Sequence, residues 1–206
     1  IRQTPVFTES MKYMVFNPYW TVPFSIATKD KLAKLKTDPS VLVKQGYEAQ
    51  PAGVSGFKPV DEFDWQNVTR GTFHYTLRQK TGPYNALGKV KFMLPNKHAI
   101  YLHDTPDHSL FSKQERNFSS GCIRVSNPLA LTQWVLNHSG QAEAIAQAEQ
   151  LLQSEETSTL YLKKPIPVLI VYFTAFANGE GTIVFRRDAY NRDSYIIEKL
   201  KEYKSA

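Results

Sequence analysis

The amino-acid sequence predicts a β-rich α+β fold that carries an inserted capping subdomain at about 22–68. Three observations lead to this prediction. Alternating apolar and polar residues indicate strands before Cys122, the pattern changes to a helical period after it, and a long stretch near the N-terminus follows neither period. With 206 residues, of which 42% are hydrophobic and 21% charged, the chain is long enough for one domain that contains such an insertion.

The N-terminal part predicts one strand and then the insertion. The strand is Met11–Phe16, and Ser25–Leu35 reads as a short amphipathic helix that stops before Pro39. Residues Gln45–Pro59 predict irregular chain. Because compact domains rarely contain so long a connection without regular structure, we expect residues 22–68 to form a lid over part of the molecule.

Strands dominate the middle of the chain. In Gly71–Gln79, the residues Phe73, Tyr75 and Leu77 alternate with polar residues, which is typical of a strand with one buried face. Two further strands are expected, at Lys89–Leu94 and Ala99–Leu102.

The last third of the chain predicts helices and one hairpin. Asn127 followed by Pro128 is the pattern of a helix N-cap and first turn, and it predicts a helix through Val135. The remaining predicted elements are a helix at Gln141–Gln153, a hairpin formed by Val168–Phe176 and Gly181–Arg186, and a tail helix at Tyr195–Tyr203.

The net charge of +6 comes from 25 basic and 19 acidic residues that are spread along the chain. A nucleic-acid-binding surface usually has its basic residues more clustered, so we expect no nucleic-acid partner. A solvated basic surface is the simplest interpretation, and the charge would also suit a polyanionic polymer of the cell envelope. The sequence contains no apolar run of about 18 residues, as a transmembrane helix would need.

Cys122 is the only cysteine, which excludes a disulfide framework and a multi-cysteine zinc site. Three histidines, His98, His103 and His108, could suggest another kind of zinc site. Their even spacing runs from a predicted strand into a loop, and no suitable acidic partner accompanies them. The sequence therefore predicts no metal.

The neighbours of Cys122 indicate a nucleophile. A lone cysteine is most often a small buried apolar residue. Here it follows Ser119-Ser120-Gly121, and His103 stands at the end of a predicted strand. Because a thiolate attacks and a thiol hardly does, an imidazole must remove the proton, and His103 is the candidate base.

Several residues could complete this site. Gly121 allows a sharp turn that directs its own amide and that of Cys122 at one point, as an oxyanion hole. The second ring nitrogen of His103 needs a partner, and either the carbonyl or the side chain of Asp104 could serve. Tyr101 stands two residues before His103, on the same face of that strand, and is expected to line the site.

Four further residues have more than one interpretation. Ser120 either fits the tight turn or donates a hydrogen bond into the site. Arg124 could lower the pKa of the thiol, hold a substrate carboxylate, or form a structural ion pair. Tyr19 and Trp20 could be substrate platforms, or they could simply pack within the insertion.

The segment from Ile100 to Arg124 resembles the signature of the L,D-transpeptidases, the YkuD-type catalytic domain. That signature is a His, a spacer, Ser/Thr-His-Gly-Cys, an apolar residue, and Asn or Arg. Here 15 residues separate His103 from Ser119, and the residues that follow Ser120 match the signature. Upstream, Asn85-Ala86-Leu87-Gly88 is similar to the Asn-x-Leu-Gly of the family. The resemblance extends from about Thr4 to Tyr190.

Ser120 stands where the family commonly has a histidine. This form resembles the YcbB-like periplasmic branch, which also carries a sizeable insertion over the active site. The departure removes a second imidazole, so His103 would act as the only base.

The resemblance implies one catalytic domain over 1–206, trimmed at its N-terminus, with a β-sandwich, flanking helices and the inserted subdomain. In the implied reaction, Cys122 attacks the carbonyl of the L-centre of meso-diaminopimelate in a tetrapeptide stem and expels D-alanine. The side-chain amine of a second stem then takes the acyl group, which gives a 3→3 cross-link. Acylation by carbapenems, the absence of a cofactor, a monomeric state and a periplasmic location with an inner-membrane anchor before Ile1 are also implied.

Two alternatives remain open at this point. A cysteine L,D-carboxypeptidase or amidase would resolve the acyl-enzyme with water. In papain-like enzymes the cysteine usually precedes the histidine, which is the opposite of the order here. A wall-binding module without catalytic activity is the other alternative.

Overall fold

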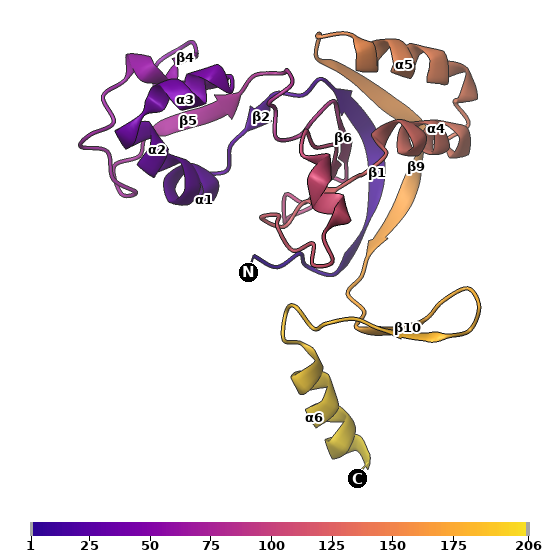
Figure 1. Ribbon diagram of the computed structural model, residues 1–206. Helices are drawn as coiled ribbons and strands as arrows, with labels where there is room; N and C mark the ends of the chain where they lie inside the picture. The colour runs from indigo at the N-terminus through magenta and orange to yellow at the C-terminus, as the bar shows by residue number, and fades with distance from the viewer. Residues whose placement is uncertain (1, 205–206) are drawn as a thin grey trace.

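A five-stranded sheet with the order β8-β7-β6-β1-β9 forms the larger unit of the computed structural model, which describes residues 2–204 (Figure 1). β7 and β8 are parallel, whereas the other neighbours are antiparallel. The strands are β1 (Phe7–Phe16), β6 (Val90–Met93), β7 (Leu102–His103), β8 (Ile123–Arg124) and β9 (Ser158–Ile170). The expected strands at the N-terminus and at residues 89–94 are therefore present.

Two helices cover this sheet and close the first core. They are α4 (Pro128–His138) and α5 (Ile145–Gln153), which follows the short 3-10 turn η4 (Ala142–Ala144). The Asn127 side chain accepts a hydrogen bond from the Ala130 amide at 3.0 Å, which confirms the predicted N-cap. The core lies between the sheet and these helices. Its fully buried residues come from both layers: Met14, Phe16, Val90 and Phe92 from the sheet, and Val135, Leu136 and Ala148 from the helices.

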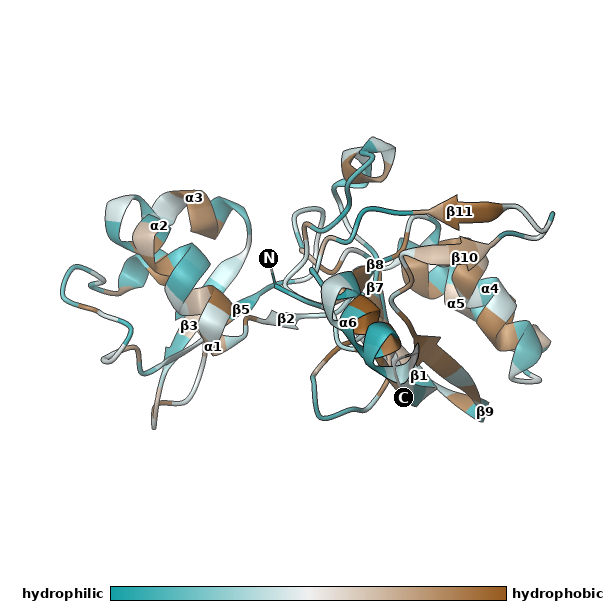
Figure 2. Cartoon of the chain, turned by 90° about the horizontal axis from the view of Figure 1, so that it is seen from below, coloured by the Kyte–Doolittle hydropathy of each residue, from teal (hydrophilic) through white to brown (hydrophobic). Residues whose placement is uncertain are grey.

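The second unit has its own four-stranded sheet, in the order β2-β5-β3-β4, and its own core. Its strands are β2 (Trp20–Thr21), β3 (Tyr47–Pro51), β4 (Lys58–Pro59) and β5 (Tyr75–Gln79). Its helical segments are α1 (Phe24–Ile26), the π-helical turn η1 (Ala27–Lys31), α2 (Leu32–Thr37), α3 (Pro39–Lys44) and the 3-10 turn η2 (Val60–Glu62). Figure 2 shows the brown, apolar stretches of α2 and α3 among teal residues.

The second unit corrects two expectations for residues 20–79. The segment Gln45–Pro59 is not irregular, because it carries β3 and β4. β5 at the end of this region pairs with β3. Its residue Leu77, and Phe73 just before it, belong to the second core, so this unit reaches Gln79. Alternation shows which face of a strand is buried, but it does not show which sheet the strand joins.

Residues 96–103 differ from the predicted strand at Ala99–Leu102. Only Leu102–His103 is a strand. The side-chain amide of Asn96 donates a hydrogen bond from Nδ2 to the Ile100 carbonyl at 2.6 Å, and Ala99 has a φ of 54°. The chain therefore turns here before it enters β7. A side chain that closes such a local turn competes with regular strand pairing.

The predicted hairpin is displaced toward the C-terminus. Val168–Ile170 belongs to β9, and the hairpin pairs β10 (Ala175–Ala177) with β11 (Ile183–Phe185). β9 is an edge strand, and an edge tolerates its two prolines, Pro165 and Pro167, which obscure its pattern.

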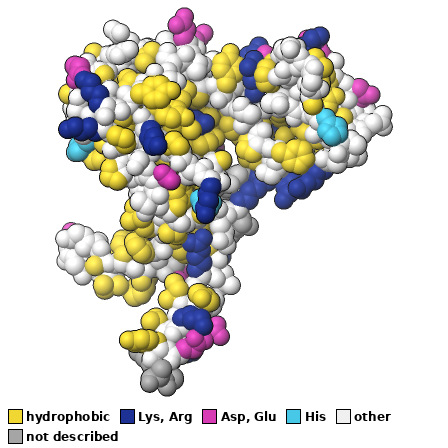
Figure 3. Space-filling view, turned by 180° about the vertical axis from the view of Figure 1, so that it is seen from behind, with side chains coloured by type: hydrophobic (Ala, Val, Ile, Leu, Met, Phe, Trp, Pro, Cys, Tyr) yellow, Lys and Arg dark blue, Asp and Glu magenta, His cyan; other side chains and the backbone are white. Residues whose placement is uncertain are grey.

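A final helix, α6 (Asp193–Lys204), agrees with the predicted tail helix. The hairpin and α6 project from the body with hydrophobic side chains at their surface (Figure 3). Among residues 2–204, no helix has the length and apolarity needed to cross a bilayer. The fold is β-rich α+β, as predicted.

Candidate active site

The parallel pair β7 and β8 brings the two segments of the sequence motif together. Leu102 is paired with Ile123 and His103 with Arg124, and the Ile123 amide donates to the Tyr101 carbonyl at 3.1 Å. Alternate residues of neighbouring strands share a face. Tyr101, His103, Cys122 and Arg124 therefore lie on one face of this edge of the sheet.

Cys122 is partly buried at the start of this strand pair. Its thiol points to the Ala99 carbonyl, with 3.7 Å between sulfur and oxygen. Burial raises the pKa of the thiol, whereas the backbone amide and hydroxyl of Tyr101 and the charge of Lys91 lower it. The sulfur is thus shielded from water but has groups around it that favour the thiolate.

His103 is buried, with 6% of its surface exposed, and its ring is fixed by one hydrogen bond. Nδ1 lies 2.5 Å from the backbone carbonyl of Asp104. Because a carbonyl can only accept, Nδ1 carries the proton and Nε2 is left as the basic nitrogen. Burial lowers the pKa of His103 to about 4, and the charges of Arg124 and Lys91 act in the same direction. The imidazole is therefore neutral at physiological pH.

The Asp104 side chain has a structural role instead of lining the site. Its Oδ2 accepts a hydrogen bond from the Lys89 amide at 2.8 Å. A Cβ on Gly88 would come within 2.3 Å of the same oxygen, so the carboxylate is packed against this loop. Neither cavity at the site includes Asp104. Its carbonyl fixes the His103 ring, and its negative charge counteracts part of the lowering of the His103 pKa.

Gly121 forms the turn before the cysteine with a φ of +125°, a conformation that glycine adopts without strain. Its amide donates to Ser119 Oγ at 3.1 Å, and its carbonyl accepts from Thr4 Oγ1 at 2.9 Å. One of the two amides expected in the oxyanion hole is therefore engaged in this turn, and the amide of Cys122 is the remaining member of the pair.

Ser120 lines the larger cavity and contacts the N-terminal segment. Its hydroxyl accepts a hydrogen bond from Arg2, whose guanidinium also forms two hydrogen bonds with Asp30 at 2.8 and 2.9 Å. Asp30 lies in η1 of the second unit. This contact, the Arg2 bridge, connects the N-terminal segment, the insertion and the loop before Cys122.

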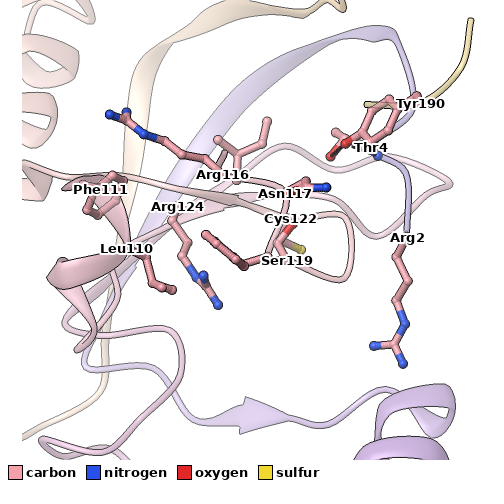
Figure 4. Close-up of a pocket in the computed structure, with 12 residues that line it drawn as sticks. Arg2, Thr4, Leu110, Phe111, Arg116, Asn117, Ser119, Cys122, Arg124 and Tyr190 are labelled. Atoms are coloured by element: carbon pink, nitrogen blue, oxygen red, sulfur yellow. Dashed lines mark hydrogen bonds between the residues drawn. The ribbon is translucent and has the colours of Figure 1, made fainter. Parts of the chain in front are cut away.

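Two cavities meet at Cys122 and Arg124. The larger, of about 580 Å³, lies between the two units and is lined by Tyr19, Trp20 and His103 among others. The smaller, of about 260 Å³, lies against the loop that joins the histidine and the cysteine (Figure 4). Its residues include Leu110, Phe111, Arg116, Asn117 and Tyr190.

Tyr19 and Trp20 both line the larger cavity and pack within the second unit. The Arg78 guanidinium lies 4.6 Å from the centre of the Tyr19 ring, and the Trp20 ring meets Tyr47 edge-on at 6.4 Å. The two residues therefore supply a fixed aromatic wall opposite Cys122.

Arg124 presents an uncompensated charge to both cavities. Its Nε is buried without a hydrogen-bond partner, and no carboxylate of residues 2–204 forms an ion pair with it. Arg124 lowers the pKa of His103, but it is not among the groups that lower the pKa of Cys122. Of the interpretations above, a free cation for a substrate carboxylate fits this position best.

Lys91 is the site residue that sequence reasoning missed. It lies on β6 opposite His103, it lines the larger cavity, and its charge lowers the pKa of the thiol. The available signal was the alternation of Lys89–Leu94, in which Lys91 occupies a polar position between the buried Val90 and Phe92.

The other histidines of the motif region have other partners, although His98 also lines the larger cavity. His98 packs against the Phe7 ring at 5.5 Å, and His108 Nε2 lies 3.9 Å from Asp104. Within the described part of the chain, no three His, Cys, Asp or Glu side chains are grouped as metal ligands would be.

Two comparisons with known proteins concern the family of the chain. The model of the YkuD family, described as the L,D-transpeptidase catalytic domain, matches residues 2–184. A relative from Haemophilus influenzae named "Putative L,D-transpeptidase" is 34% identical over 203 residues. The alignment spans 95% of this chain but only 39% of the relative. The chain is therefore similar to less than half of that longer protein.

Proposed function

The chain belongs to the YkuD family of L,D-transpeptidase catalytic domains, and we propose that it forms 3→3 cross-links in peptidoglycan through an acyl-enzyme on Cys122. The donor is a tetrapeptide stem that loses D-alanine. The acceptor is the side-chain amine of meso-diaminopimelate in a second stem. No cofactor takes part in this scheme.

The observation that carries the proposal is the pairing of a thiol with a histidine whose tautomer is fixed for base catalysis. The Asp104 carbonyl keeps the proton on Nδ1 of His103, and the lowered pKa keeps Nε2 unprotonated near neutral pH. A nucleophile with an oriented base on the same face of a sheet is the arrangement required for acyl transfer.

The reaction follows from these positions. Nε2 of His103 takes the thiol proton while the sulfur of Cys122 attacks the stem carbonyl carbon. The amide of Cys122 stabilises the oxyanion. When the carbon–nitrogen bond breaks, His103 returns the proton to the departing D-alanine amine and a thioester remains. The acceptor amine then attacks the thioester, gives a proton to His103, and the sulfur leaves and is reprotonated.

Two features favour an amine over water as the acceptor. The sulfur lies where two cavities meet, so a donor and an acceptor can approach from different sides. Arg124 reaches both cavities with a free charge, which suits the carboxylates of the stem peptides. We assign the larger cavity, under the aromatic wall of Tyr19 and Trp20, to the donor.

The remaining parts of the proposal concern the setting of the reaction. The second unit acts as a lid over the donor cavity. Carbapenems acylate Cys122 because they present a strained carbonyl and a carboxylate. The domain acts as a monomer in the periplasm, where its substrate is, and is held at the inner membrane by sequence outside this chain.

The decisive experiment is intact-protein mass spectrometry with a carbapenem, on the natural chain and on Cys122→Ala. We expect one covalent adduct on the natural chain and none on the variant. An equal adduct on Cys122→Ala would reject the assignment of the nucleophile. Products from a tetrapeptide stem separate the transpeptidase from the hydrolytic alternative, since cross-linked dimers support the transpeptidase and tripeptide alone supports an L,D-carboxypeptidase.

A further inference from the structure

Lys91 lies beside the catalytic pair and forms no ion pair with a carboxylate of residues 2–204. It is paired with His103 across β6 and β7, and its ammonium lies 4.0 Å from the centre of the Tyr101 ring. That ring meets the His103 ring edge-on at 5.8 Å. The face of an aromatic ring stabilises a cation, so Tyr101 holds the ammonium in place.

Among residues 2–204, Cys122 is the group whose charge raises the pKa of Lys91, which otherwise contacts the ring of Tyr101. His103 on β7, Arg124 on β8 and the Cys122 thiol just before β8 line the site beside Lys91. None of the ion pairs formed by residues 2–204 includes Lys91. The Asp104 carboxylate is bound to the Lys89 amide. From the insertion, Asp30 is bound to Arg2, and the Lys31 ammonium lies over Tyr47.

Lys91 and Cys122 shift each other's pKa in the directions expected for a cation beside a thiolate. Burial lowers the pKa of Lys91, and the charge of Cys122 raises it. The Lys91 charge in turn lowers the pKa of Cys122. Because the imidazolium form of His103 is disfavoured by burial and by Arg124, histidine alone is a poor counter-ion for the sulfur.

We propose that Lys91, held on the Tyr101 ring, is the positioning residue that serves as the resident counter-ion of the Cys122 thiolate. The inference rests on the proposed role of Cys122 as the nucleophile. His103 still takes the proton when the thiol ionises, and Lys91 keeps its own protons throughout. Its task is to offset the burial that would otherwise keep the sulfur protonated.

Alkylation of the protein by iodoacetamide tests this role directly. The reagent is small and uncharged, and Cys122 is the only cysteine, so the rate reports on one thiolate. In Lys91→Met, we expect the midpoint of the rate-against-pH curve to move up by about one pH unit, which slows alkylation about tenfold near pH 7. Lys91→Arg keeps the charge and should restore most of the rate.

Lys89→Met is the matched control. Lys89 is close to Lys91 in the chain, but its ammonium donates to the Ser154 carbonyl at 3.3 Å and it lines neither cavity. Its alkylation curve should coincide with that of the natural chain. If Lys91→Met does not fold, as judged by circular dichroism, Lys91→Gln is measured in its place.

An unchanged midpoint in the Lys91 variants would overturn the proposal. If these variants instead raised only the KM for a stem peptide, Lys91 would bind a substrate carboxylate and would not act on the sulfur. The alkylation assay needs no wall substrate. A chain that is alkylated as expected but makes no cross-links would therefore contradict the proposed function and leave the role of Lys91 supported.

Discussion

The insertion and the catalytic unit are built on different principles. The insertion, residues 20–79, is held by a cluster of aromatic rings: Phe63, Trp65, Phe73 and Tyr75 lie with their centres 4.6 to 6.1 Å apart. The catalytic edge of the large sheet instead consists of two-residue strands, a turn at Gly121 and buried polar groups. The insertion supplies a rigid wall, and the catalytic unit supplies the chemistry.

The connection between the units is narrow and polar. Trp20 pairs with Gln79, so the chain enters and leaves the insertion at adjacent points. Beside this neck, Asn85 donates to the Pro18 carbonyl at 2.9 Å and Gln79 donates to the Tyr84 carbonyl at 2.6 Å. The Arg2 bridge is a further link. The insertion is thus joined to the catalytic unit at this neck and at the Arg2 bridge.

The largest effect is expected when the insertion is removed at its structural boundary. Replacing Trp20–Gln79 by a short glycine linker should leave the large sheet folded, because the two ends are paired neighbours. Without the aromatic wall and the lid, we expect acylation by a tetrapeptide donor to fall about a hundredfold, which corresponds to about 2.7 kcal/mol of lost transition-state stabilisation. Single-turnover mass spectrometry measures this rate.

Iodoacetamide alkylation of the same variant is the control, and it should remain within a few-fold of the natural rate. Donor acylation at the natural rate would show that the insertion plays no part in binding. A shorter deletion, of Ser25–Phe63, should aggregate, because it leaves Phe73 and Leu77 without their core.

A pair of glycine substitutions compares the packing of the two units. Gly88→Ala places a Cβ within 2.3 Å of Asp104 Oδ2 at a φ of +60°, so we expect a loss of about 3 kcal/mol from overpacking and backbone strain. Gly53→Ala in the insertion has a φ of +77° but no neighbour within 4 Å. Its cost should be about 1 kcal/mol.

Urea unfolding of both variants gives the two values. Equal losses would contradict the tight packing of Asp104 against the Gly88 loop. Since the Asp104 carbonyl orients His103, Gly88→Ala should also slow acylation, whereas Gly53→Ala should not.

The pH dependence of stability should come from the catalytic unit. His103 has a pKa of about 4 when folded and an ordinary value of 6.5, so the unfolded chain binds more protons between these values. Stability is therefore fully present above pH 6.5 and is lost as the pH falls toward 4, by about 3 kcal/mol in total.

The free energy of unfolding at pH 7 and pH 4.5, on the natural chain and on His103→Gln, measures this contribution. The variant should lose less stability than the natural chain over this range. His138→Gln, which replaces an exposed histidine on α4, is the control and should behave like the natural chain. An identical loss in His103→Gln would rule out the buried neutral imidazole.

The sequence predicts the catalytic unit better than it predicts the insertion. The N-cap at Asn127 and the strand at residues 89–94 follow from local patterns, and the structure contains both. The motif also predicts that the nucleophile and the base lie on neighbouring strands, because the residues that form the β7–β8 pairing belong to the motif. Local sequence patterns predict an element correctly where the residues that determine its structure lie within the element itself.

Residues whose role depends on distant partners were the ones that could not be predicted. The strand at Tyr75–Gln79 shows its alternation but not its partner β3. Lys91 appears as an ordinary polar position of a strand until β7 lies beside it. In the sequence, Asn85 and Gly88 stand out only as part of a motif. In the structure, Asn85 closes the neck and Gly88 leaves room for the Asp104 side chain.

The smallest effect is expected at the Arg2 bridge. Asp30→Asn removes an ion pair whose side chains are 36% and 43% exposed, so global stability should change by less than about 1 kcal/mol. The bridge nevertheless connects the insertion to Ser120, which stands two residues before Cys122. Its loss should raise amide hydrogen exchange in η1 and in residues 119–121 while leaving the aromatic core of the insertion protected.

Lys58 and Glu62 supply the control, because their ion pair of 3.4 Å lies entirely within the insertion. Glu62→Gln should leave exchange at residues 119–121 unchanged. If Asp30→Asn and Glu62→Gln behave alike, the bridge does not couple the two units, and the lid is positioned by the neck alone. Faster exchange in η1 together with a lower KM or faster donor entry would instead identify the bridge as the contact that must open before the donor binds.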